Sequence, residues 1–176
     1  MNNIKKSIIT AVMIALCVVL PMALHGIPKS GIIISPMHFP VLLCGLVCGP
    51  IYGLFSGVVG VFLSSLLTGM PPAPVLPGMV VELFFYGLSA GLFIKFIRTG
   101  KTLVDVYASL VLAMLVGRIA GGLAKALIFA RGSYSLAAWA SGYFVATMPG
   151  MILQLILLPL IYVTLEKSNL IPARNN

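Results

Sequence analysis

Three charged side chains stand inside apolar stretches long enough to cross a membrane: Glu82, Arg118 and Lys125. Charged groups are costly in lipid, so they usually face a bundle interior or a watery cavity and mark a site or pathway. Arg118 and Lys125 are close to two helical turns apart and therefore project from one face of a helix. The spacing predicts a polar binding pocket enclosed by apolar helices.

The chemistry that fits these charges is the binding of an anion. Glu82 can pair with Arg118 or Lys125 and so hold two helices together, but one cation then lacks a protein partner. A buried charge without compensation is costly, and a ligand carboxylate or phosphate would neutralise it. Arginine offers a planar fork for a carboxylate, whereas lysine offers a point charge.

Three uncharged or weakly charged side chains are further candidates for contact with a ligand. His38 stands at the start of an apolar stretch at the level of Glu82, where it can also serve as a hydrogen-bond donor at a helix start. Tyr86 lies one turn from Glu82, and Gln154 lies deeper, near the middle of the last apolar stretch.

Enzyme and metal chemistry find little support in the sequence. It contains no nucleophile elbow, zinc-protease motif, nucleotide-binding loop or paired carboxylates. An enzyme would have to use an unrecognised pair such as Glu82 with His38. The cysteines, with one nearby histidine, do not complete a metal site, and we interpret them as small apolar filler. We therefore expect no catalysis, no metal and no cofactor in this chain.

Composition excludes an ordinary soluble domain. The 176 residues are 60% hydrophobic and 8% charged, against about 25% charged in soluble proteins. The apolar runs are continuous rather than alternating, which favours helices over a barrel. We predict one all-α integral membrane domain over residues 1–176, with six transmembrane helices at about 5–24, 37–49, 51–68, 76–97, 104–129 and 142–165. The second helix is short for a span of about 20 residues.

The distribution of lysine and arginine predicts the orientation. With the N-terminus inside, only Lys29 and Arg131 fall in outer loops. Both termini should then be cytoplasmic, and the net charge of +8 is attributed to topology and anionic lipid rather than nucleic acid. The inner cations are Lys5, Lys6, Lys95, Arg98, Lys101, Lys167 and Arg174.

The outer loops of this arrangement are about 25–36, 69–75 and 130–141. The second contains Met70, Pro71 and Pro72, a run that cannot continue a helix and resembles a stiff extended cap. The third contains Trp139 and Tyr134. These loops could close over a ligand, or they could be plain turns.

Small residues recur at four-residue spacing, which allows helices to approach closely in lipid. They serve either packing within the bundle or contact with a second membrane protein. The pairs are Ala11/Ala15, Gly45/Gly49, Gly53/Gly57 and Gly117/Gly121.

Several local sequences carry a family resemblance. They are AVMIA at 11–15, SPMHFPVLLCG at 35–45, TGMPP at 68–72 and AMLVGR at 113–118. With the chain length and the six predicted helices, they make residues 7–165 resemble a substrate-binding (S) component of energy-coupling factor (ECF) vitamin transporters.

The resemblance implies a multi-pass protein of a bacterial cell membrane that binds a vitamin on its outer side. It implies partners, a membrane scaffold subunit and two cytoplasmic ATPases that consume ATP and drive toppling of the S component. The helix-1 face with Ala11 and Ala15 would dock on the scaffold. A stand-alone carrier or channel is the alternative of another class, although the two halves show no convincing repeat.

The vitamin is less sharply defined by the resemblance. The chain looks closest to the branch associated with pantothenate, whose single carboxylate suits one spare cation. Thiamine is cationic, and folate carries two carboxylates and a large ring. Cobalamin, handled by a related branch, stays open as an alternative.

Overall fold

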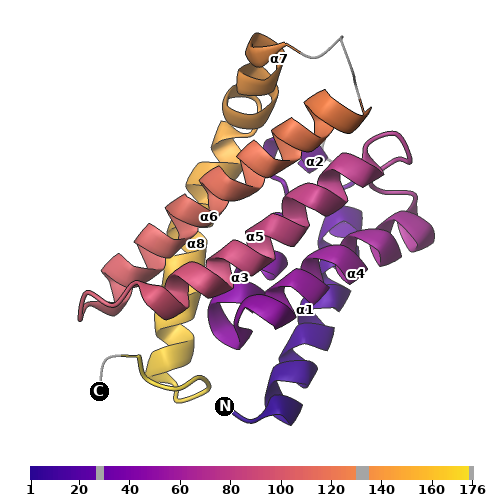
Figure 1. Cartoon of the computed structure of the whole chain (residues 1–176). Helices are drawn as coiled ribbons and strands as arrows, with labels where there is room; N and C mark the ends of the chain where they lie inside the picture. Colours follow the sequence, from indigo (N-terminus) through magenta and orange to yellow (C-terminus); the bar gives the residue numbers. More distant parts are fainter. Residues whose placement is uncertain (27–29, 130–134, 175–176) are drawn as a thin grey trace.

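The computed structural model describes residues 1–26, 30–129 and 135–174, and every regular element in these ranges is helical (Figure 1). The predicted all-α class is therefore confirmed. The α-helices are α1 (Asn3–Ala23), α2 (Ser30–Ile33), α3 (His38–Cys48), α4 (Pro50–Thr68), α5 (Leu76–Phe96), α6 (Thr102–Ala124), α7 (Leu136–Ala140) and α8 (Met148–Lys167), with π-helical turns η1 (Lys125–Phe129) and η2 (Ser141–Val145).

Five of the six predicted spans are helices long and apolar enough to cross a membrane: α1, α4, α5, α6 with η1, and α8. The sixth, α3, has 11 residues and is about 16 Å long, roughly half of a bilayer's hydrocarbon core. The predicted break after α3 is present, because Gly49 has a φ of 97° and Pro50 begins α4.

The last third of the chain differs most from the predicted boundaries. The helix predicted at 104–129 loses α-helical form at Lys125. The helix predicted at 142–165 begins only at Met148, with Pro149 in its first turn. Part of the predicted loop 130–141 is helix α7, which Ser135 caps by accepting a hydrogen bond from the amide of Ala138. Arg131 and Tyr134 lie outside the described residues, as does Lys29.

Helix α5 is the centre of the bundle and packs against α3, α4 and α6. Its Gly87 contacts α4 so closely that a Cβ there would collide with the carbonyl of Gly53. Gly45 of α3 meets the same stretch of α5, and Gly117 of α6 packs on the ring of Tyr86. These glycines serve internal packing, whereas Ala11 and Ala15 on α1 are exposed.

Both termini lie at one end of the bundle, which we call the terminal end; the opposite end is the cavity end (Figure 1). The ammonium of Lys5 donates a 2.5 Å hydrogen bond to the carbonyl of Leu170. Asp105, near the start of α6, is fully buried at this end and pairs with Arg174 at 2.8 Å.

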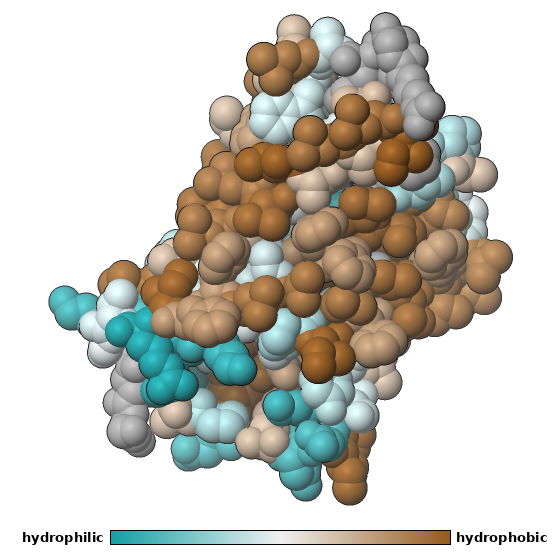
Figure 2. All heavy atoms as spheres, in the orientation of Figure 1, coloured by the Kyte–Doolittle hydropathy of each residue, from teal (hydrophilic) through white to brown (hydrophobic). Residues whose placement is uncertain are grey.

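The outer surface of the bundle suits a lipid environment. Large apolar side chains are exposed along α1, α4, α6 and α8. Figure 2 shows hydrophobic residues covering the body of the visible face, with hydrophilic residues gathered toward the terminal end. An apolar belt above a polar end is typical of a membrane protein that meets water at that end.

Candidate binding site

A cavity of about 660 Å³ lies at the cavity end, walled by α5, α6, η2 and the start of α3. Its volume is in the usual range for pockets that hold drug-sized ligands. Four predicted site residues line it: His38, Glu82, Arg118 and Lys125. The prediction that Arg118 and Lys125 share one helix face is thereby confirmed. Other lining residues include Ser35, Pro74, Met79, Tyr143 and Thr147.

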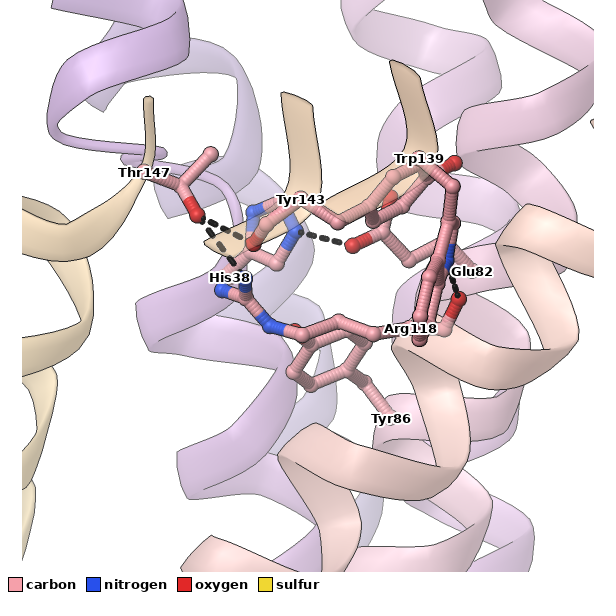
Figure 3. A network of polar contacts seen from close by, with 7 residues as sticks. All are labelled: His38, Glu82, Tyr86, Arg118, Trp139, Tyr143 and Thr147. Atoms are coloured by element: carbon pink, nitrogen blue, oxygen red, sulfur yellow. Dashed lines mark hydrogen bonds and ion pairs between the residues drawn. The ribbon is translucent and has the colours of Figure 1, made fainter. Parts of the chain in front are cut away.

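Arg118 is held rigidly in the cavity wall, with only 2% of its surface exposed (Figure 3). Its Nε donates to the hydroxyl of Tyr86 at 2.8 Å, and a terminal nitrogen donates to the hydroxyl of Thr147 at 2.8 Å. The guanidinium carbon lies 5.3 Å from the centre of the Phe144 ring. A guanidinium carries five N–H donors, so donors remain beyond these two contacts.

The backbone of Arg118 is fixed as well. Its carbonyl accepts a 3.1 Å hydrogen bond from the indole of Trp139. This indole packs directly on Gly122, where a Cβ would collide with the ring, and its ring centre is 5.2 Å from that of Phe144. Trp139 therefore anchors α7 to α6 and supports the cavity from behind.

Glu82 pairs with His38 and not with Arg118, which was one of the two cations considered as its partner. The nearest atoms, His38 Nε2 and Glu82 Oε1, are 3.4 Å apart. The described residues place no carboxylate within ion-pair distance of Arg118. The cause is helix register: Glu82 packs against Gly121, about one turn beyond Arg118, while the arginine turns toward Tyr86 and Thr147.

The cavity is therefore polarised. One part of its wall carries the Arg118 guanidinium among neutral hydroxyls, and another carries the His38–Glu82 pair (Figure 3). A buried cation held only by neutral partners favours an anion beside it. Among the described residues, no three metal-ligating side chains gather in one place.

A family model described as the substrate-specific component of ECF transporters matches residues 5–162. The chain belongs to this family. Among curated proteins and solved structures, no match was found.

Membership in the family makes the chain a substrate-binding S component, and it implies a membrane scaffold, ATPase partners and a small-molecule substrate. Such proteins are subunits of transporters, which agrees with the prediction that this chain is not an enzyme. Family and apolar helices together indicate a multi-pass protein of the plasma membrane. The resemblance carried by the local sequences is thus confirmed at the level of the family.

Two predicted site residues of this S component lie outside the cavity lining. Tyr86 is fully buried beneath Arg118 and acts on the cavity through it. Gln154 is buried in α8, and its amide atoms have no hydrogen-bond partner among the described residues. Neither side chain lines the cavity.

The predicted lid residues also lie outside the lining. The segment with Met70, Pro71 and Pro72 ends in a turn, closed by a 2.9 Å hydrogen bond from the amide of Val75 to the carbonyl of Pro72. It is tied to α4 by Ser65, whose hydroxyl donates to the carbonyl of Pro71 at 2.8 Å. The residues that follow, Pro74 and Val75, form part of the cavity wall.

The sequence reasoning missed Tyr143 and Thr147, which line the cavity from η2 and its end. They were assigned to the first two turns of the last predicted helix, at about 142–165. Two residues indicate where the helices of this region begin. Ser135 is a typical N-cap residue, which marks the start of α7. Pro149 is typical of the first turn of a helix, which marks the start of α8.

Proposed function

We propose that this S component captures pantothenate in the cavity lined by Arg118 and passes it to partner subunits for ATP-driven uptake. The observation that carries the proposal is the state of Arg118. It is buried, and the described residues hold it from both sides through neutral hydroxyls. A ligand carboxylate would supply the missing negative charge in bidentate geometry.

The remaining cavity chemistry suits the other groups of such a ligand. Glu82 and His38 offer an acceptor and a titratable ring for hydroxyl or amide groups. Lys125 lines the same cavity and adds positive potential. A ligand with one carboxylate and several neutral polar groups therefore matches the lining better than a cation or a dianion.

The cavity volume also bears on cobalamin, the second candidate within the family. About 660 Å³ is available, which falls within the range for drug-sized ligands of roughly 300–1,000 Å³. A corrinoid is several times larger than pantothenate and would need a much wider opening. The size of the cavity favours pantothenate.

Equilibrium binding to the purified protein in detergent tests this proposal. Labelled pantothenate should bind saturably, and Arg118→Ala should lose about 2–4 kcal/mol of binding free energy, since a charged contact is removed from a buried site. Arg98→Ala, an arginine of the terminal end, is the matched control. Equal affinity in wild type and Arg118→Ala overturns the site, and binding of cobalamin in place of pantothenate overturns the ligand.

We propose further that the chain crosses the membrane six times, with α3 as a short crossing. Its first residue, His38, contacts Glu82, and its last, Cys48, contacts the carbonyl of Lys6 near the start of α1. Helix α3 thus returns the chain from the cavity toward the terminal end. The excess of lysine and arginine at that end favours a cytoplasmic location for both termini and an outward-facing cavity.

Helix α1 is the proposed docking surface for the scaffold subunit that acts with two ATPases. Ala11 and Ala15 are exposed on it, beside exposed Ile8, Val12 and Val19. Small residues within an apolar face allow close approach of a partner helix in lipid. This assignment rests on membership in the family.

A double substitution of Ala11→Trp with Ala15→Trp tests the docking surface. The added bulk should abolish co-purification with the scaffold and ATP-dependent uptake while leaving pantothenate affinity unchanged. Leu115→Trp with Ile119→Trp, at exposed positions of α6, is the control. Uptake that survives the α1 substitutions contradicts the docking assignment.

We expect the natural setting of this protein to be a bacterial cell membrane.

A further inference from the structure

A second cavity, of about 230 Å³, lies at the terminal end. Its wall is formed by Arg98, which follows α5, by Tyr162 of α8 and by the C-terminal segment 171–174. It shares no lining residue with the proposed substrate site. Nothing in the proposed transport function uses it.

Arg174 gives this cavity a fixed wall. Its Nε donates to Asp105 at 2.8 Å, its NH2 group donates to the carbonyl of Ile97, and its amide donates to Glu166 at 2.5 Å. Asp105 in turn accepts from the amide and hydroxyl of Thr99 at 2.8 and 2.7 Å. The C-terminal segment is thereby fastened to the turn between α5 and α6.

The charges of the cavity do not cancel. Asp105 neutralises Arg174, but Arg98 forms no ion pair with any carboxylate of the described residues. No acidic residue is in the lining. Lysines of the same end add positive potential, namely Lys5, Lys6, Lys95, Lys101 and Lys167.

The surroundings of the cavity are amphipathic. Phe96, two residues before Arg98, is 73% exposed, and Leu170, next to the tail segment, is 51% exposed. Exposed apolar side chains beside arginines at a helix end match the boundary between lipid tails and headgroups. Basic pockets between helices at the cytoplasmic side are suited to anionic lipid headgroups.

We propose that this cavity binds a phosphate group through the Arg98 guanidinium, with Arg174 and the Tyr162 hydroxyl forming its wall. Arginine forms strong paired hydrogen bonds with phosphate oxygens. The phosphate belongs either to the headgroup of an anionic lipid at the inner leaflet or to a free phosphate ion. In both cases Arg98 is the side chain on which affinity depends.

Two assays distinguish these sources. In the first, the full chain is placed in nanodiscs of phosphatidylcholine and phosphatidylglycerol, and native mass spectrometry after release counts the retained lipids. In the second, inorganic phosphate is titrated into the protein in neutral detergent by calorimetry. Wild type is compared with Arg98→Ala and with Lys101→Ala, which removes an exposed charge outside the lining.

A headgroup site predicts that wild type and Lys101→Ala retain phosphatidylglycerol at least fivefold more often than Arg98→Ala. A free-phosphate site predicts saturable phosphate binding that is lost in Arg98→Ala, without a difference in lipid retention. If wild type and Arg98→Ala behave alike in both assays, the proposal is overturned. The emission spectrum of Trp139, far from this end, verifies that each variant is folded.

Discussion

The hydroxyl of Tyr86 lies 2.8 Å from Nε of Arg118, and the same tyrosine ring meets His38 edge-on, with ring centres 5.0 Å apart. Tyr86 thus contacts both parts of the polarised cavity wall from below. A residue that is fully buried and outside the lining therefore determines where the cationic group of the site stands.

Replacing Tyr86 by phenylalanine isolates this hydroxyl, since the ring and its packing on Gly117 are kept. Arg118 loses a hydrogen-bond acceptor, and we expect pantothenate affinity to fall about tenfold, or ~1.4 kcal/mol. Isothermal titration in detergent measures the change. Tyr52→Phe, whose ring lies near Lys6 at the terminal end, is the control. An unchanged dissociation constant for Tyr86→Phe contradicts a positioning role.

Thr147 supports the other side of the guanidinium, and a valine there keeps the shape but removes the oxygen. Its hydroxyl accepts from Arg118 and donates to the carbonyl of Tyr143 at 2.7 Å. We expect Thr147→Val to weaken pantothenate binding about three- to tenfold, measured as above.

Thr164→Val is a close control for this change. Thr164 lies in helix α8, which begins directly after Thr147, and makes the same kind of bond to the carbonyl four residues earlier, at 2.8 Å, but it does not line the cavity. Both variants lose one such bond, so only the loss of the arginine contact differs. Equal affinities in the two variants would show that Thr147 does not act through Arg118.

Gly122 provides a spectroscopic test of the wall behind the cavity. A methyl group at this position collides with the indole of Trp139, which must move and lose its hydrogen bond to Arg118. Trp139 is the single tryptophan of the chain, so Gly122→Ala should shift the emission maximum to longer wavelength and weaken ligand binding. Gly26→Ala meets no atom within 4 Å and should leave the spectrum as in wild type. An unshifted Gly122→Ala spectrum would argue against the observed packing of α7 on α6.

Most of the helical architecture was predictable because apolar runs of spanning length leave the backbone few alternatives in lipid. That Arg118 and Lys125 line one cavity followed from helical periodicity. The partner of Glu82 did not follow, because residues on different helices meet according to the relative shift of the helices. Side-chain spacing within one helix contains no information on that shift.

Contacts between distant parts of the chain were the least predictable. Asp105 and Arg174 are separated by 69 residues. Charge patterning placed Arg174 among the inner cations but gave no indication of its partner. Helix α7 was taken for loop, because a helix of five residues has no long apolar period, and most of η2 was assigned to the last predicted helix. Only the cap residue of α7 and Pro149 mark the limits of the α7–η2 segment.

The Asp105–Arg174 pair gives a prediction about stability that is independent of the ligand. Asp105 has no exposed surface, so removing its cationic partner leaves a buried carboxylate that keeps its hydrogen bonds from Thr99 but has no compensating charge among the described residues. Breaking a buried pair of this kind typically costs about 3–5 kcal/mol, and Arg174→Ala should therefore lower the melting temperature in detergent markedly. Lys167→Ala removes an exposed charge nearby and should change the melting temperature little.

Replacing both partners, as Asp105→Asn with Arg174→Ala, should restore part of the lost stability because no uncompensated charge remains. If the double variant is less stable than Arg174→Ala, the network acts mainly through the hydrogen bonds that Asp105 accepts from Thr99. If Arg174→Ala melts at the wild-type temperature, the buried pair itself is contradicted.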